Sequence, residues 1–301
     1  MIDLHTHSSA SDGSLSPKDL VEAAKNQGLS ALALTDHDTI AGLQAAAERA
    51  RELDIRFIPG VEFEINWVRY RKVEPLAQLP EEDPAQSLEE RPTRGVFHLL
   101  GLGLTRPGKE FVEAIEGLVR LREERNFKIL DIMDKMDIHG DYEDIKKYAG
   151  GNVVGRPHFA SFLVEKKLVK NIHQAFDTYL SKGRPLFVPR DALELEKALE
   201  LIHNAGGKAV LAHPLSLYVS WGRLPGLLRE WKDKGLDGIE AWHPTAKERT
   251  ARRFEELGRS LGLCITAGSD FHGASRPERR LGYTSGNRKI DETFLDELEI
   301  G

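Results

Sequence analysis

Short apolar runs alternate with segments of helical spacing through the first third of the chain. Apolar runs at residues 1–4, 31–34 and 55–58 predict strands, and the segments between them have the spacing of amphipathic helices. Ser16 and Pro17 supply an N-cap and a first-turn proline for the first helix. This alternation is typical of βαβ units and predicts a largely parallel sheet.

The same alternation returns in the second half of the chain. Further strands are expected at residues 96–102, 209–212, 237–241 and 263–267, which makes seven in all, with helices at 193–204 and 245–261. Residues 107–189 are strongly charged, have helical spacing and contain no evident strand. We therefore expect an α/β barrel-type domain formed by residues 1–104 and 190–301, with a helical substrate-capping subdomain inserted at residues 105–189.

Residues 69–94 interrupt the pattern with four prolines and an acidic cluster. A long segment without secondary structure inside a domain is usually either functional or mobile. We expect an exposed, mobile excursion, and a lid over a site is the alternative.

Nine histidine and carboxylate side chains occur at or near the expected strand ends. His5 and His7 lie two residues apart on an extended segment, so both imidazoles point the same way. His98 lies within its expected strand. The other downstream residues, His37, Glu62, His213, Asp270 and His272, each follow their strands by a few positions. Because the strand C-termini of an alternating α/β fold emerge on one face, these side chains are expected to converge. The full set is His5, His7, Asp12, His37, Glu62, His98, His213, Asp270 and His272.

Each of these residues has an ordinary explanation when it is taken alone. A His-x-His pair can arise by chance, an aspartate after a strand is often a helix cap, and a buried histidine is usually a hydrogen-bonded core residue. These explanations do not account for the whole set, because six of the eleven histidines and three carboxylates lie on one expected face. We interpret the set as a metal site.

Imidazole and carboxylate ligands without thiolate favour Mn²⁺, Fe²⁺ or Zn²⁺ over an all-oxygen Mg²⁺ or Ca²⁺ site. We expect Mn²⁺, with Zn²⁺ and Fe²⁺ as alternatives, and about two to three ions per chain. Such ions lower the pKa of bound water and hold the attacking and leaving oxygens of an in-line displacement. Hydrolysis of a phosphate ester fits this chemistry best.

The order of the motifs HxH, SDG, TDHD, PGVE, HLLG, AHP and SDFH resembles the PHP (polymerase and histidinol phosphatase) superfamily. The resemblance covers almost the whole chain and is closest to the branch of nucleotide-directed phosphoesterases that includes 3′,5′-nucleoside bisphosphate phosphatases and 5′-to-3′ exoribonucleases. It implies a distorted seven-stranded (βα) barrel and a trinuclear site. By motif, the first ion would be held by His5, His7, Glu62 and Asp270, the second by Glu62, His98 and His213, and the third by Asp12, His37 and His272. The residues expected to act in catalysis are His5, His7, Asp12, His37, Glu62, Asp270 and His272.

Three further residues are candidates for substrate binding. Arg156 and His158 lie in a Gly-Arg-Pro-His run that resembles one in this branch and implies contact with a substrate phosphate. An arginine fork pairs with phosphate through two hydrogen bonds. The ordinary explanation is a surface arginine and a histidine at a helix start. His243 follows the sixth expected strand on the same face, so that contact with substrate and a purely structural role are equal alternatives.

The formal charge of −6 provides no general attraction to nucleic acid or anionic membrane, so a long nucleic-acid footprint is not expected. No apolar run approaches a membrane span, Cys264 is the single cysteine, and the first strand leaves no room for a signal peptide. We expect a cytoplasmic metal-dependent phosphoesterase acting on a small nucleotide such as adenosine 3′,5′-bisphosphate or on short 5′-phosphorylated RNA. Histidinol phosphate hydrolysis and a non-catalytic metal- or nucleotide-binding module are the alternatives.

Overall fold

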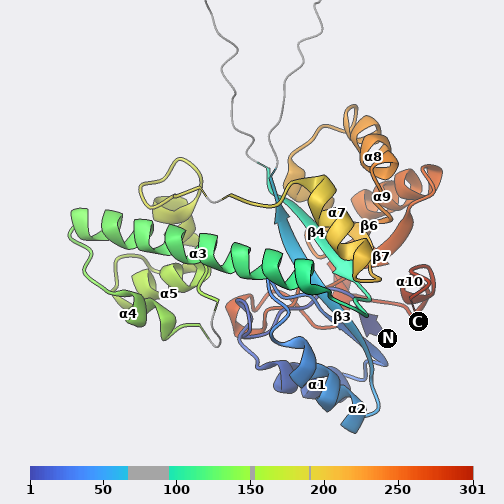
Figure 1. The fold of residues 1–301 in the computed structure, drawn as a ribbon, viewed down its shortest axis with the longest axis horizontal. Coiled ribbons are helices and arrows are strands. Elements are labelled where there is room, and N and C mark those ends of the chain that lie inside the picture. Colours follow the sequence, from blue (N-terminus) through green and yellow to red (C-terminus); the bar gives the residue numbers. More distant parts are fainter. Residues whose placement is uncertain (67–94, 150–152, 190, 301) are drawn as a thin grey trace, which may run out of the picture.

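A computed structural model describes residues 1–66, 95–149, 153–189 and 191–300. Seven strands form one sheet in the order of the chain, and the sheet curls into a nearly closed barrel with helices around it (Figure 1). The expected α/β barrel is therefore confirmed. The loop expected at residues 69–94 lies outside the described residues. The strands are β1 (Ile2–Asp3), β2 (Ala31–Leu34), β3 (Arg56–Ile65), β4 (Phe97–Leu102), β5 (Lys208–Leu211), β6 (Gly238–Trp242) and β7 (Cys264–Ala267).

One strand of the barrel runs against the others. β4 pairs antiparallel with both β3 and β5, whereas the remaining pairs are parallel. The start of β4 therefore lies at the end of the barrel where the parallel strands finish. Between the segments that follow β1 and β7, the amide of His7 donates to Phe271 O and the amide of Asp270 donates to His5 O, both at 2.9 Å. These bonds draw the two edges of the sheet together at the same end.

Helices cover the outside of the barrel. α1 (Pro17–Asn26) begins as expected, with the Ser16 side chain accepting from the amide of Asp19. The segment after β2 first forms a turn, in which Thr39 Oγ1 accepts from the amide of Ala41, and α2 (Leu43–Glu52) follows this turn. The remaining outer helices are α7 (Leu195–Asn204), α8 (Leu224–Asp233), α9 (Glu248–Ser260) and α10 (Thr293–Asp296).

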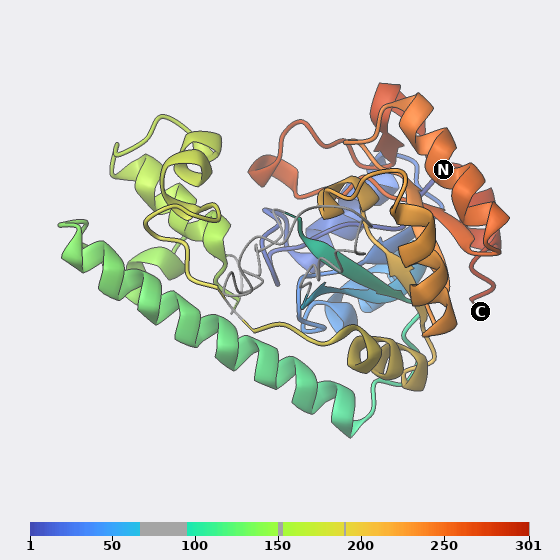
Figure 2. The same cartoon turned by 90° about the horizontal axis from the view of Figure 1, so that it is seen from above.

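The segment between β4 and α7 is helical, and much of it projects from the barrel (Figure 2). The N-terminal half of its long helix α3 packs Phe111, Ile115 and Leu118 on the barrel core. The other half contributes Ile129 and Met133 to a separate hydrophobic cluster. The elements of this segment are α3 (Lys109–Lys135), α4 (Tyr142–Lys146), α5 (Arg156–Glu165), α6 (Ile172–Ala175) and a π-helical turn, Phe176–Leu180.

None of the helices in the described residues is both long enough and apolar enough to span a bilayer. The sequence did not predict α8, which fills the connection between β5 and β6. It also did not predict α10 or the hairpin of β8 (Tyr283–Thr284) and β9 (Arg288–Lys289) that follows β7.

The separate cluster predicts how the projecting segment responds to a core deletion. Phe162 is 1% exposed at the centre of this cluster, whereas Phe127 on α3 is 51% exposed. Phe162→Ala is expected to cost about 3 to 5 kcal/mol of stability, because it leaves a cavity, and Phe127→Ala should cost far less. Urea denaturation followed by the helical circular dichroism signal measures both variants. Equal shifts of the two midpoints would contradict the packing described here.

Candidate metal centre

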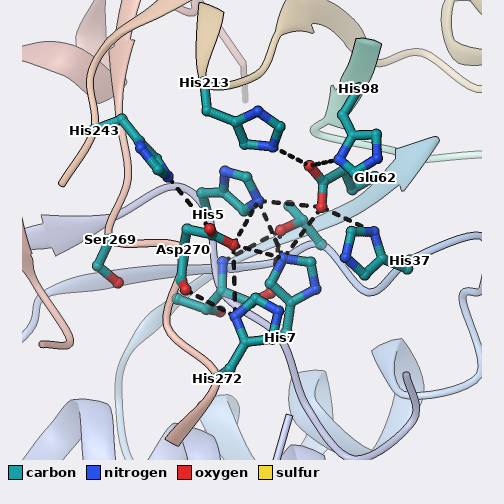
Figure 3. Close-up of polar contacts among 12 residues, drawn as sticks. His5, His7, His37, Glu62, His98, His213, His243, Ser269, Asp270 and His272 are labelled. Carbon is teal, nitrogen blue, oxygen red and sulfur yellow. Dashed lines mark hydrogen bonds and ion pairs between the residues drawn. The ribbon is translucent and has the colours of Figure 1, made fainter. Parts of the chain in front are cut away.

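All nine candidate ligands meet at one end of the barrel, and Figure 3 labels all of them except Asp12. Most follow a parallel strand, as expected. His98 reaches the same end as the second residue of β4, because that strand runs in the opposite direction. Glu62, which was expected after a strand, lies inside β3. The expectation was wrong because β3 continues through Pro59 and Gly60 to pair with the whole of β4.

His5, His7, Glu62 and Asp270 form the first group of donors. The two histidine Nε2 atoms are 3.1 Å apart, and each lies 3.2–3.3 Å from Glu62 Oε2 and 3.4–3.6 Å from Asp270 Oδ1. Ligand atoms at about 2.0 to 2.2 Å from a shared ion lie roughly 3 Å or a little more from one another. The spacing of these four atoms therefore suits one ion.

The carboxylate of Glu62 divides its two oxygens between neighbouring groups. Oε1 lies 2.9 Å from both His98 Nδ1 and His213 Nε2. Oε2 faces the first group and also lies 3.0 Å from His37 Nδ1. Because the side chain is completely buried, water does not solvate its charge. Glu62 thus has the position of a bridging ligand.

Asp12, His37 and His272 form a third group, together with His7. Asp12 Oδ1 lies 3.3 Å from His272 Nε2, and Asp12 Oδ2 lies 3.9 Å from His37 Nε2. Four donor atoms, one from each residue, lie within 4.8 Å of one another. The 3.9 Å distance is longer than any in the first group, so a bound ion would have to draw Asp12 and His37 closer together.

Unpaired buried atoms indicate that the donors fit metal ions. His7 Nδ1 and His272 Nε2 are buried and have no hydrogen-bond partner. His272 Nδ1 contacts the carbonyl of Asp270 at 2.8 Å, so Nε2 presents a lone pair toward the oxygen of Asp12. A lone pair facing a carboxylate oxygen is repulsive unless a cation lies between them. The donor chemistry and the missing partners both favour cations at this site.

The electrostatics of His7 support the same conclusion. Burial by itself lowers the pKa of His7, but hydrogen bonding to Asp270 and Glu62 outweighs burial and raises the pKa to about 9. The carboxylates therefore favour a positive charge at this imidazole, which a divalent ion can supply in place of a proton.

Glu240 orients His5 of the first group and was not among the site residues predicted from the sequence. Its Oε1 lies 2.9 Å from His5 Nδ1, and its Oε2 accepts from the backbone amide of His213 at 2.7 Å. Accepting from Nδ1–H leaves His5 Nε2 unprotonated and directed at the cluster. The signal in the sequence was an acidic residue inside the apolar run of β6. A buried strand acid requires a partner.

Strained backbone and one glycine bring the ligands close. His213 has φ 26° and Asp270 has φ 51°, a region that costs free energy for residues other than glycine. At Gly268, a Cβ atom would lie 2.2 Å from His5 Cβ and 2.5 Å from Glu240 Oε1. Only glycine lets the end of β7 approach the His5 side chain this closely.

The loop that carries Asp12 is held by Asp36. The Oδ1 atom of this buried carboxylate accepts from the amide of Ser8 and the hydroxyl of Ser11, and Oδ2 accepts from the Ser8 hydroxyl. Asp36 therefore fixes residues 8–11 rather than the imidazole of its neighbour His37.

Two cavities adjoin each other at Val96 and Tyr218, and one of them opens on the cluster. The first, of about 790 Å³, lies between β3, β4 and the projecting helical segment, and it is lined by Arg125, Arg156, Lys182 and Arg184 among others. The second, of about 710 Å³, opens on the cluster itself, and it is lined by His37, Glu62, His98, His213, His243 and Asp270, with apolar residues between 214 and 224 opposite.

The three candidate substrate residues have different positions. Arg156 lines the first cavity, where its guanidinium lies 5.5 Å from the ring centroid of Phe187. His243 lines the second cavity and has Nε2 3.3 Å from Asp270 Oδ2. His158 is buried and lines neither cavity; its Nδ1 accepts from the amide of Gly155 and caps its own helix.

Comparison with known proteins identifies the family. A family model described as PHP domain matches residues 3–207. The chain belongs to the PHP family. It is 35% identical over 270 residues to a 5′-3′ exoribonuclease of Haemophilus influenzae, and the aligned region covers 90% of this chain and 89% of that protein. It is 29% identical over 299 residues to a 3′,5′-nucleoside bisphosphate phosphatase of Chromobacterium violaceum, covering 99% and 96% of the two chains.

A solved structure of similar shape is an amidohydrolase from Chromobacterium violaceum with bound sulfate and no metal. It matches with a TM-score of 0.81 and 27% identity, covering 98% of this chain and 96% of that one. The resemblance drawn from the motifs is therefore confirmed. This PHP protein is a hydrolase, a metal-dependent phosphoesterase.

The bridging position of Glu62 leads to a prediction about metal content. Glu62→Gln should bind fewer ions and lose activity by several orders of magnitude, because the amide offers one neutral oxygen where the carboxylate offers two charged ones. Elemental analysis after reconstitution with Mn²⁺ tests this, with the exposed Glu248→Gln as control. Unchanged metal content and rate in Glu62→Gln would reject the bridge.

A second prediction concerns Glu240, which contacts no candidate ion itself. Glu240→Ala should weaken metal affinity by about 10- to 100-fold, because His5 loses the acceptor that fixes its ring. Glu240→Gln retains an acceptor for His5 and should lose less. Titration of the metal-free proteins with Mn²⁺ gives the affinities. Equal affinity in all three proteins would mean that Glu240 does not orient His5.

Proposed function

We propose that this phosphoesterase removes phosphate from small nucleotides, with 3′,5′-nucleoside bisphosphates or short 5′-phosphorylated RNA as substrates and Mn²⁺ as the native ion. The observation that carries the proposal is the cationic first cavity, which adjoins at Val96 and Tyr218 the second cavity that opens on the nine-residue cluster. A nucleotide with two phosphate groups needs one site for cleavage and another that recognises the second phosphate. The activities named for the Haemophilus influenzae and Chromobacterium violaceum relatives support this substrate class.

The proposed site has three ions, divided among the ligands as the motif resemblance implies. His5, His7, Glu62 and Asp270 would hold the first, Glu62, His98 and His213 the second, and Asp12, His37 and His272 the third. Bound ions would lower the pKa of water and polarise the phosphate oxygens. The chain itself contributes fixed geometry, since Glu240 orients His5 and Asp36 holds the loop of Asp12.

The proposed domain division assigns recognition to the helical segment. Residues 1–104 and 190–301 would form the catalytic barrel, and residues 105–189 would cap the substrate. The separate hydrophobic cluster between Ile129 and Leu186 supports this division. The cavity walls support it too, because Arg156, Lys182 and Arg184 come from the cap and Ile65 comes from the end of β3. A nucleotide phosphate there would be recognised by guanidinium and ammonium groups.

A substrate panel tests the proposed class. Release of phosphate by Mn²⁺-loaded protein would be measured for a nucleoside 3′,5′-bisphosphate, a short 5′-phosphorylated RNA and histidinol phosphate. The two nucleotides are expected to have the higher kcat/KM. A higher value for histidinol phosphate would assign the enzyme to the alternative activity instead.

Arg156 separates recognition of the second phosphate from metal binding. Arg156→Ala should lower kcat/KM for the bisphosphate by about 2 to 5 kcal/mol of transition-state stabilisation, because a desolvated charge-assisted contact is lost. A simple aryl phosphate lacks the second phosphate and should lose far less. Metal content should not change, and the exposed Arg51→Ala serves as control. Equal losses on both substrates, or a loss of metal, would remove Arg156 from substrate recognition.

A further inference from the structure

Two arginines lie directly beside the cluster, in the segment that follows it along the chain. Arg276 Nη1 lies 2.9 Å from Asp270 Oδ2, and Arg279 Nη2 lies 3.7 Å from the same oxygen. The other oxygen of Asp270 faces the imidazoles of His5 and His7 at 3.6 and 3.4 Å. Asp270 therefore lies between the two guanidinium groups and the imidazoles of His5 and His7.

Arg279 has unused hydrogen-bonding capacity. Its side chain is 10% exposed, and its Nε and Nη1 atoms are buried without a hydrogen-bond partner. Glu278 Oε1 lies 3.6 Å from Nε, too far for a hydrogen bond. The adjacent Arg280, in contrast, stacks on Tyr283 and donates to Asn287. Burying an unpaired guanidinium N–H is costly, so the position of Arg279 favours an anionic ligand.

The local charges point in the same direction. The carboxylates of Asp12, Glu62, Glu240 and Asp270 carry four negative charges around the cluster. The three divalent ions of the proposed site and the two arginines would together carry eight positive charges, so the occupied site would have a positive excess. An anion that contacts both arginines and the cluster would reduce this excess.

The second cavity provides the space for such an anion. Arg276 and Arg279 line it together with His98, His213 and His243, and Arg276 is 40% exposed toward solvent. None of the described residues from 105–189 is among the residues that line it. An anion bound by these arginines would therefore lie against the cluster, in the second cavity and not in the one that Arg156 lines.

We propose that Arg276 and Arg279 bind the phosphoryl group that is cleaved, and so are recognition residues of the reaction common to every substrate. Arg156 has the complementary role, since it would recognise only a second phosphate. The guanidinium forks would stabilise the negative charge on the phosphoryl oxygens in the transition state. This assignment is independent of which nucleotide is the natural substrate.

The experiment compares Arg276→Ala, Arg279→Ala and Arg279→Lys with Arg280→Ala as the matched control. Four quantities are measured on the Mn²⁺-loaded full chain: kcat/KM for a nucleoside 3′,5′-bisphosphate, kcat/KM for p-nitrophenyl phosphate, the Kd of inorganic phosphate by calorimetry, and metal content. Both alanine variants should lose about 10- to 100-fold in kcat/KM on both substrates and bind phosphate more weakly. Their metal content should match that of the wild type. Arg280→Ala should match the wild type in all four measurements.

Three results would overturn the proposal. Unchanged phosphate affinity in both alanine variants would exclude contact with the phosphoryl group. Loss of metal would show that the arginines act by holding Asp270, and loss on the bisphosphate alone would assign them to the second phosphate. Arg279→Lys keeps the positive charge but not the forked guanidinium, so its loss of kcat/KM should be intermediate. If Arg279→Ala does not fold, Arg279→Lys is used in its place. Hydrolysis of p-nitrophenyl phosphate without hydrolysis of nucleotides would reject the proposed substrate class and leave this test intact.

Discussion

The buried carboxylate of Glu62 is the constraint on which the site depends. Five imidazoles surround it, with His98 and His213 at one oxygen and His5, His7 and His37 at the other. A carboxylate removed from water is costly unless positive charge lies next to it. Neutral imidazoles supply lone pairs rather than charge, so the arrangement requires protons or metal ions. The barrel, the strained turns at His213 and Asp270 and the buried carboxylates of Glu240 and Asp36 hold this arrangement together.

The sequence alone predicted the seven strands and the residues that converge at one end of the barrel. Prediction succeeded because each strand contains a short apolar run and most ligands follow a parallel strand, so that local patterns and a parallel topology suffice for them. His98 shows the limit of this reasoning. It belongs to the set only because β4 runs antiparallel, and no local pattern states the direction of a strand.

Other features depend on contacts between distant segments and could not be predicted. Glu240 orients His5, 235 residues away along the chain, and Gly268 matters only because the His5 side chain lies against it. Arg276 and Arg279 carry no motif, and their importance follows from the one oxygen that they face. An acidic residue inside an apolar strand, such as Glu240, can be recognised in the sequence as a residue that needs a partner. Which residue that partner is can be seen only in the folded structure.

The cap and the metal site are joined through α3. The first half of this helix is packed into the barrel core and the second half into the separate cluster, so that one rigid element spans both. Midway along it, Arg122 forms an ion pair with Asp38, a buried residue with φ 51° that directly follows His37. A shift of α3 would therefore act on the turn that holds His37 as well as on the wall of the first cavity. One helix thus links the packing of the projecting segment to the turn that carries His37.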